Sequence, residues 1–210
     1  MANVLYIHGM GGGGDSRIPS ILKECLPGSV SVVVRTYSFD PEVGARQISS
    51  WCDELHPDLV IGESLGALQA LRVRGVPLVF VSPALNAPYY FEMLSWLTVV
   101  PGVTWIFDRI YRPKAGDRQS LHFTFGVLRK YLSHRKAALC NSLREGENGC
   151  FHAFFGTSDH YRRSGIVSIR TWKKHFGQTY TMYEGSHFME DEFVRTILLN
   201  KILNVLNVNK

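Results

Sequence analysis

The sequence alternates short apolar runs with longer amphipathic stretches, and this alternation restricts the chain to a small set of folds. Several of the short runs are almost uninterrupted in apolar and β-branched residues, which is typical of strands that are buried on both faces. The longer stretches repeat apolar residues at helical spacing. This order of elements predicts an α/β fold in which a doubly wound, mostly parallel sheet of six strands carries helices on both faces.

The expected elements follow one another with short connections over most of the chain. The strands are expected at Val4–His8, Val30–Arg35, Asp58–Gly62, Val76–Ser82, Cys150–Gly156 and Gln178–Tyr183. The helices are expected at Ile18–Leu26, Glu42–Leu55, Ser64–Val73, Lys136–Leu143, Ile166–Phe176 and Glu190–Leu206.

One segment, 83–133, interrupts this rhythm between the fourth and fifth strands. It is rich in aromatic residues and is much longer than a plain connection, so it is expected to have structure of its own. We interpret it as a helical cap or lid inserted into a single domain that spans 1–210, because 210 residues fit one domain.

Charge and cysteine content argue against several classes of protein. The net charge is +5, and the basic residues cluster at 129–136 and 170–174. Neither cluster accompanies a known nucleic-acid-binding motif, so solvated helix faces are the simpler interpretation and no nucleic-acid partner is expected. The four cysteines form no CxxC pair, so no metal site is expected.

The apolar stretches are too short for a membrane span or an export signal. The longest of them, 95–107, is interrupted by Pro101 and Gly102 and is shorter than the roughly 20 residues that a spanning helix needs. The N-terminus has no basic region, and its apolar run ends at His8. We therefore expect a cytoplasmic protein without stable membrane insertion.

The motif Gly62-Glu63-Ser64-Leu65-Gly66 is the strongest chemical signal. A buried strand is expected before it and a helix after it, which is the setting of a serine nucleophile on a strained turn. Small residues on both sides of Ser64 would let neighbouring backbone pass close to the turn. The competing interpretation is an ordinary glycine-containing turn with a capping serine.

A serine hydroxyl needs a base, and His187 is the preferred candidate. It follows the last expected strand and precedes the final helix, and open α/β sheets place their sites at the carboxyl ends of the strands. His160 is the rival, but it lies next to the proposed acid in the sequence. Adjacent residues rarely allow the base to contact both the serine and the carboxylate.

The acid that orients the histidine is expected to be Asp159, which follows the fifth strand. Asp40, after the second strand, is the alternative. The order Ser64, Asp159, His187 is the order of the hydrolases that carry their serine on such a turn.

Two backbone amides are expected to stabilise the oxyanion of a tetrahedral intermediate, those of Met10 and Leu65. Met10 lies in the glycine-rich turn that ends the first strand, and Leu65 follows the proposed nucleophile. His8, in the same turn, is expected to have a structural role.

The same turn also allows a dinucleotide-binding interpretation. Gly9, Gly11 and Gly14 satisfy GxGxxG, and Arg35 closes the second strand about twenty residues later, as in an NADP site. The run is so rich in glycine that the match carries little information. It also leaves Ser64, Asp159 and His187 without a role.

With HGMG, GESLG, GTSD and GSH at successive strand ends, the chain resembles an α/β-hydrolase over nearly its whole length. It resembles in particular the small YqiA-like serine esterases, through the opening turn, Ser82-Pro-Ala-Leu after the fourth strand and the closing Gly-Ser-His-Phe. The resemblance implies a Ser64–Asp159–His187 triad and carboxylester hydrolysis through an acyl-enzyme. The segment 83–133 matches only loosely, so the substrate range does not carry over.

Together these observations predict a serine hydrolase that cleaves a small-molecule ester or thioester without a metal or organic cofactor. Peptide hydrolysis would use the same groups. The alternative is a non-catalytic protein of the same fold that binds a partner or small ligand, because fold does not imply function.

Overall fold

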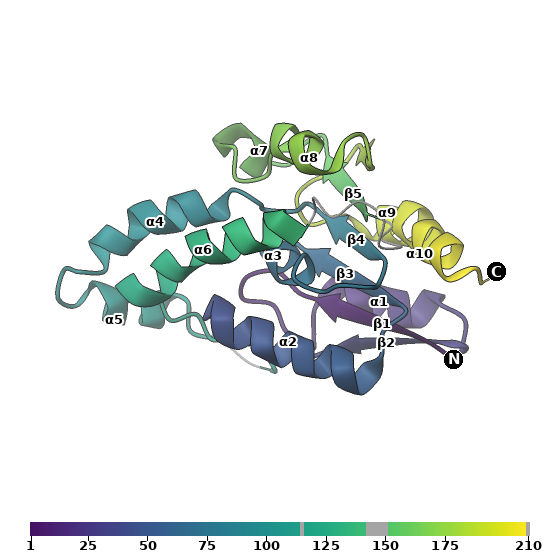
Figure 1. Ribbon diagram of the computed structural model, residues 1–210, viewed down its shortest axis with the longest axis horizontal. Helices are drawn as coiled ribbons and strands as arrows, with labels where there is room; N and C mark the ends of the chain where they lie inside the picture. The colour runs from purple at the N-terminus through teal and green to yellow at the C-terminus, as the bar shows by residue number, and fades with distance from the viewer. Residues whose placement is uncertain (114–115, 142–150, 209–210) are drawn as a thin grey trace.

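The computed structural model describes residues 1–113, 116–141 and 151–208, and its centre is a six-stranded, wholly parallel sheet (Figure 1). The strand order is β2-β1-β3-β4-β5-β6. The strands are β1 (Ala2–Ile7), β2 (Val30–Val34), β3 (Leu59–Glu63), β4 (Leu78–Val81), β5 (Phe151–Gly156) and β6 (Tyr180–Tyr183). The predicted fold class and all six predicted strands are confirmed, with ends that differ by a few residues. Cys150, the expected start of the fifth strand, lies outside the described residues.

Both faces of the sheet are buried because the inner strands alternate between two hydrophobic cores. In β1, Leu5 and Ile7 face one core, and Val4 and Tyr6 face the other. The first core lies under α2 (Pro41–Leu55), α3 (Gly66–Ala70), α6 (Phe125–Asn141) and α8 (Ile169–Phe176). The second lies under α1 (Arg17–Cys25) and the C-terminal helices. Burial on both faces explains why the strands are almost continuously apolar.

Local sequence signals set the ends of the helices. Asp40 caps α2 by accepting hydrogen bonds from the amides of Glu42 and Val43, at 3.0 and 3.3 Å. Ser168 caps α8 by accepting from the amide of Thr171. The C-terminal stretch, expected as one helix, comprises α9 (Asp191–Phe193), a π-helical turn η1 (Val194–Leu198) and α10 (Leu199–Leu206).

Two helix predictions need correction. The helix expected at Ser64–Val73 is the much shorter α3, because Ser64 and Leu65 form the turn that leads into it. The stretch expected at Ile166–Phe176 begins as a helix only at Ile169 and is preceded by the short α7 (Tyr161–Ser164).

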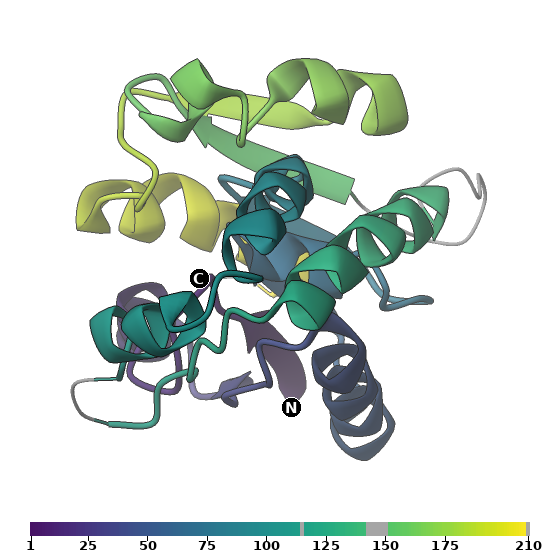
Figure 2. The same cartoon turned by 90° about the vertical axis from the view of Figure 1, so that its left-hand side faces the viewer.

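The segment 83–133 contains two complete helices and the start of a third. These are α4 (Ala87–Leu97), α5 (Val103–Ile110) and α6, which begins at Phe125 and extends beyond the expected end of the segment. The helix expected at Lys136–Leu143 is thus the second half of α6, and Leu143 lies outside the described residues. The paired helices α4 and α6 project from the sheet, and α5 lies near their far end (Figures 1 and 2). No helix in the described part of the chain is both long and apolar enough to cross a membrane.

Candidate active site

Ser64 occupies a strained turn between β3 and α3. Its φ angle is +50°, a left-handed conformation that non-glycine residues rarely adopt. The chain turns sharply here because its flanking glycines pack against backbone. A Cβ on Gly66 would lie 2.3 Å from the carbonyl oxygen of His8, and a Cβ on Gly62 would lie 2.9 Å from the Cα of Ala67. This is the steric reason expected for small residues on both sides of the serine.

The structure brings Ser64, His187 and Asp159 together from three loops. His187 Nε2 lies 2.9 Å from Ser64 Oγ, and His187 Nδ1 lies 2.8 Å from Asp159 Oδ2. The loops follow β3, β6 and β5, so all three residues lie at the carboxyl edge of the sheet. The imidazole and the carboxylate are both almost wholly buried. The second oxygen of Asp159 accepts a hydrogen bond from the amide of Tyr161 at 2.8 Å, which fixes the carboxylate.

The alternative acid and the rival base lie in other surroundings. Asp40 caps α2 and pairs with Lys130 at 2.7 Å. Partial burial acts to raise the pKa of Asp40, but the hydrogen bonds from Lys130 and from the helix amides outweigh this effect and lower the pKa. His160 is exposed, and its ring centroid lies 6.1 Å from that of His187.

The backbone amides of Met10 and Leu65 are available for a ligand. Both residues line the same pocket as Ser64, and among the described residues neither amide has a hydrogen-bond acceptor. Leu65 precedes the first residue of α3, and Met10 lies in the loop between β1 and α1. Their role as donors to an oxyanion stays a prediction.

The loop that carries Met10 is held by Gln119, a buried residue that the sequence analysis did not identify. The side-chain oxygen of Gln119 accepts a hydrogen bond from the amide of Gly11 at 3.1 Å, and its side-chain nitrogen donates to the carbonyl oxygen of Tyr37 at 3.0 Å. Its backbone amide donates to the carbonyl oxygen of Gly12 at 2.7 Å. The polypeptide between α5 and α6 therefore braces the loop between β1 and α1.

His8 packs beneath this loop and does not line the pocket. Its ring stacks on Tyr37 at a centroid distance of 4.5 Å, and its Nδ1 lies 2.8 Å from the carbonyl oxygen of Gly9. Burial lowers the pKa of His8, so the ring is held in its neutral form. These contacts agree with the structural role expected for it.

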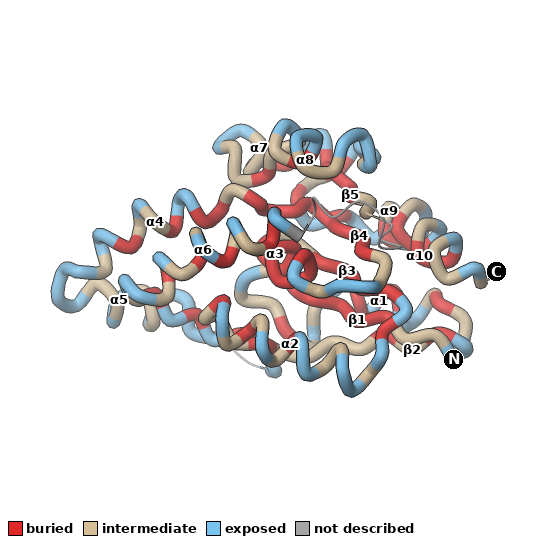
Figure 3. The backbone as a smooth tube through the Cα atoms, viewed as in Figure 1, coloured by how far each residue is buried: buried red, intermediate tan, exposed pale blue. Residues whose placement is uncertain are grey.

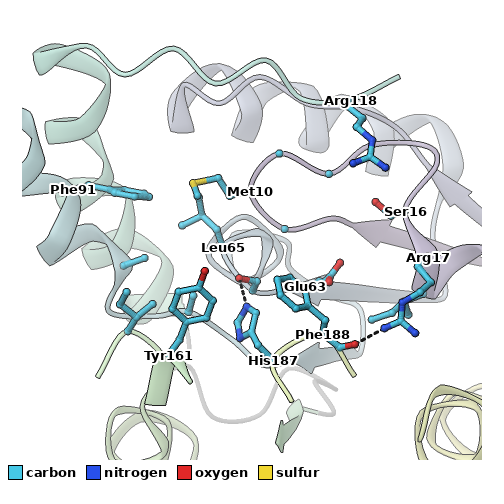
Figure 4. Close-up of a pocket in the computed structure, with 18 residues that line it drawn as sticks. Met10, Ser16, Arg17, Glu63, Leu65, Phe91, Arg118, Tyr161, His187 and Phe188 are labelled. Atoms are coloured by element: carbon cyan, nitrogen blue, oxygen red, sulfur yellow. Dashed lines mark hydrogen bonds between the residues drawn. The ribbon is translucent and has the colours of Figure 1, made fainter. Parts of the chain in front are cut away.

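Ser64 opens into a pocket of about 350 Å³, a size that suits a small organic molecule. Figure 4 shows Phe91 and Tyr161 on one side of this pocket and Ser16, Arg17 and Arg118 on the other. The first side is largely apolar, whereas the second mixes polar and charged residues with apolar ones such as Phe188. Arg17 is bound to Asp191 and to two backbone carbonyls, and Arg118 pairs with Asp15 at 2.9 Å.

Glu63, next to Ser64, also lines the pocket. One of its oxygens accepts a hydrogen bond from the hydroxyl of Tyr6 at 2.8 Å. Burial, and then the charge of Glu63, raise the pKa of Tyr6, so its hydroxyl keeps its proton and holds the carboxylate in place.

Most of these lining residues were not singled out from the sequence. Glu63 was visible inside the serine motif, and Tyr161 lies two residues after Asp159. By contrast, Phe91, Arg17 and Arg118 come from distant parts of the chain and carry no motif.

The dinucleotide interpretation finds no support in the position of Arg35. Its guanidinium is bound to both oxygens of Glu54, at 2.5 and 2.6 Å, and it lies over the ring of Trp51. In the described part of the chain, no group of three or more His, Cys, Asp or Glu side chains could hold a metal ion.

The sheet order and the serine turn define the α/β-hydrolase fold, and comparison with solved structures agrees. A monoacylglycerol lipase from Paleococcus ferrophilus is similar, with a TM-score of 0.62 and 18% identity, over 97% of this chain and 93% of that one. A thermophilic esterase from Thermogutta terrifontis has a TM-score of 0.62 and 12% identity, over 99% and 90% of the two chains. MenH from S. aureus has a TM-score of 0.62 and 14% identity, over 98% and 93%.

Comparison by sequence finds no relatives in addition to these structural matches. Neither the protein-family models nor the curated proteins match this chain. The structural likenesses establish the fold, while the resemblance to the YqiA-like esterases stays a prediction.

Proposed function

We propose that this protein is a serine hydrolase that cleaves a carboxylic ester or thioester through an acyl-enzyme on Ser64. The observation that carries the proposal is the hydrogen-bonded series from Ser64 Oγ through the His187 ring to Asp159, with distances of 2.9 and 2.8 Å. A histidine between a serine hydroxyl and a buried carboxylate is the arrangement that activates serine as a nucleophile.

Acylation begins when Ser64 Oγ attacks the substrate carbonyl carbon and its proton passes to His187 Nε2. The ring keeps its other proton on Nδ1, where Asp159 holds the tautomer and stabilises the imidazolium that forms. The amides of Met10 and Leu65 donate to the oxyanion of the tetrahedral intermediate. When the intermediate collapses, the alkoxide or thiolate leaves with the proton from His187, and the acyl group stays on Ser64.

Deacylation repeats the same steps with water. His187 takes a proton from the attacking water, the second oxyanion binds to the same amides, and Ser64 regains its proton as the acid leaves. Each half-reaction returns the protein groups to their starting protonation states, so no cofactor takes part in this scheme.

The lining of the pocket suggests which substrates to test first. The apolar side near Phe91 and Tyr161 suits an acyl chain, and the side near Glu63 suits a polar substituent. The lipase and esterases of the same fold act on comparable bonds, as their names state. Aryl esters and acyl thioesters with short and medium chains are therefore the first substrates to compare.

Labelling with a fluorophosphonate, followed by mass spectrometry of the modified peptide, tests the proposal directly. We expect a single adduct on Ser64 that is lost in His187→Ala, and a fall in turnover of roughly a thousandfold or more in Ser64→Ala. Ser82 provides a matched control, because it also ends a strand with a positive φ of 46° but is fully buried. Ser82→Ala should keep the label.

Two results would contradict the proposal. One is folded protein that takes up no label, which would favour a binding protein with this fold. The other is Ser64→Ala protein that retains wild-type turnover.

A further inference from the structure

The far end of the projecting helices carries an unusually large exposed apolar surface, which we call the cap tip. Figure 3 shows that many of the residues at this end are exposed. Exposed fractions reach 72% for Met93, 61% for Trp96, 63% for Trp105 and 64% for Ile110. The cap tip consists of Met93, Trp96, Leu97, Val99, Val100, Trp105, Ile106 and Ile110, all of them exposed.

These side chains are not part of either hydrophobic core. Helix α5 has no buried residue, although it consists largely of apolar residues. The link between α4 and α5 adds Val99 and Val100, which are 59% and 55% exposed. Exposed apolar side chains gathered on one part of a surface mark a site that something else covers.

Arginine side chains border the cap tip and lie over its tryptophan rings. The guanidinium carbon of Arg109 lies 5.7 Å from the centre of the Trp105 ring, and that of Arg129 lies 5.7 Å from the centre of the Trp96 ring. Among the described residues, Arg109 has no carboxylate partner, and neither does Arg112, which lies two residues beyond the end of α5. These two cations are therefore available to bind anionic groups.

In the described part of the chain, the nearby acidic side chains form no ion pair with Arg109 or Arg112. Asp108 is bound to His122 at 2.8 Å, and Glu92 lies 4.0 Å from Arg129. The border of the cap tip thus combines tryptophan with unpaired arginine around an apolar centre. Tryptophan and arginine are the residues that proteins place at the level of lipid head groups.

The cap tip is also connected to the catalytic pocket. Helix α4 carries Met93 and Trp96 of the cap tip as well as Phe91, which lines the pocket beside Ser64. On the other side, Tyr111 and Arg112 line a groove that shares Met10 and Gly11 with the pocket. The cap tip is therefore joined to the pocket beside Ser64 through α4, and its border is joined to the neighbouring groove through Arg112.

We propose that the cap tip docks on the surface of a lipid bilayer that contains anionic phospholipids. The apolar side chains of the α4–α5 link enter the region between head groups and acyl chains, while Arg109 and Arg112 bind lipid phosphates. This contact is peripheral and requires no spanning helix. Docking does not depend on the hydrolase chemistry, because none of the cap-tip residues belongs to the Ser64 site.

A second copy of this chain is the main competing occupant. Self-association through the cap tip would bring Arg109 and Arg112 of two copies to the same interface, where like charges repel. A bilayer with anionic lipids instead supplies phosphates for these arginines and an apolar layer for the link.

The test is co-sedimentation with vesicles of phosphatidylcholine alone, or of phosphatidylcholine and phosphatidylglycerol in equal amounts. Ser64→Ala protein should be used beside the wild type, so that lipid hydrolysis cannot alter the vesicles. We expect binding to the mixed vesicles, weaker binding to phosphatidylcholine alone, and a loss of about tenfold or more in affinity for Val99→Asp/Val100→Asp. Met182→Asp is the matched control, because Met182 is 43% exposed on β6.

Tryptophan fluorescence gives an independent measurement of the orientation. Brominated lipids should quench Trp96 and Trp105, whereas Trp172 is fully buried in the core and should not respond. The double variant Trp96→Phe/Trp105→Phe should still bind vesicles but lose most of the quenching. Thermal unfolding of each variant checks that the fold is retained.

Any of the following outcomes would overturn the proposal. The first is wild-type protein that sediments with neither kind of vesicle. The second is Val99→Asp/Val100→Asp protein that binds as the wild type does, or bound protein without quenching. The third is a dimer in solution that this variant converts to a monomer while neither form binds vesicles. None of these outcomes depends on whether Ser64 is labelled.

Discussion

Replacing Gly66 with alanine perturbs the contact between the serine turn and the end of β1. The new Cβ would lie 2.3 Å from the carbonyl oxygen of His8 and 2.6 Å from that of Ile7. Ordinary van der Waals contact for a Cβ begins near 3.4 Å, so the overlap is about 1 Å. The atoms in the way are backbone, and no side-chain rotation can relieve the overlap. Either α3 or the strand end has to move.

The expected cost in stability follows from this overlap. Forcing an extra methyl into a packed site costs roughly 1–3 kcal/mol. Gly66 is the first residue of α3, and alanine in place of glycine at a helical position stabilises the helix by at most about 1 kcal/mol. The free energy of unfolding should therefore fall by about 1–2 kcal/mol, which corresponds to a decrease in melting temperature of roughly 2–8 °C.

The effect on activity should be larger than the effect on stability. The segments pushed apart carry Leu65 and, two residues beyond His8, Met10, whose amides we propose as oxyanion donors. A displacement of about 1 Å between catalytic groups can reduce the rate about a hundredfold. We expect kcat for an aryl ester to fall by about this factor while the protein remains folded at room temperature.

The assay compares denaturant unfolding and ester hydrolysis of Gly66→Ala with those of Gly28→Ala. A Cβ on Gly28 meets no atom within 4 Å, so this control carries the same chemical change without the overlap. The reasoning would be refuted by a Gly66→Ala protein with wild-type stability and wild-type kcat.

Three further predictions concern single side chains. Asp159→Asn should lower turnover by about ten-thousandfold because the wrong His187 tautomer is held. Asp40→Asn keeps a side-chain oxygen that caps α2 and loses only the ion pair with Lys130, so it should cost at most about 1 kcal/mol in stability and leave turnover intact. Equal loss of turnover in both variants would contradict the assignment. Gln119→Ala should lower kcat more than it raises KM, because Gly11 loses the bond that braces the Met10 loop; an unchanged kcat would argue against bracing. Burial lowers the pKa of His134 to about 4, so the unfolded chain binds its proton first, and this residue alone should lower the stability by up to about 3 kcal/mol between pH 6.5 and 4. In urea titrations at several pH values, the free energy of unfolding of His134→Gln should depend less on pH than that of the wild type. A pH profile identical to that of the wild type would contradict this role of His134.

The fold was largely predictable because its strands are encoded locally. An inner strand buried on both faces needs apolar residues at nearly every position, so β1, β3 and β4 stand out without any knowledge of their neighbours. Helices were harder to delimit. Helix α6 begins eleven residues before its expected start at Lys136, because its first half packs on α4. Contacts of this kind leave no local signal in the sequence.

The residues of the candidate site likewise divide into those that the sequence indicates and those that it does not. Ser64, His187 and Asp159 could be chosen from the sequence because each follows a strand, and parallel strands all deliver their loops to one edge of the sheet. The sequence favoured Asp159 over Asp40 only weakly, because both residues follow strands. Gln119 could not be found at all, because a buried glutamine that holds a distant loop has no motif.

The sequence by itself thus determined which runs are buried, where the serine turn lies, and which polar residues follow strands. These features depend on periodicity, glycine and chain direction, all of which act over a few residues. Only the tertiary structure decided which carboxylate contacts His187, which residues from distant segments line the pocket, and that the cap tip stays exposed. Each of these depends on packing between segments far apart in the chain, and side-chain contacts at that range are fixed by the complete fold rather than by local sequence.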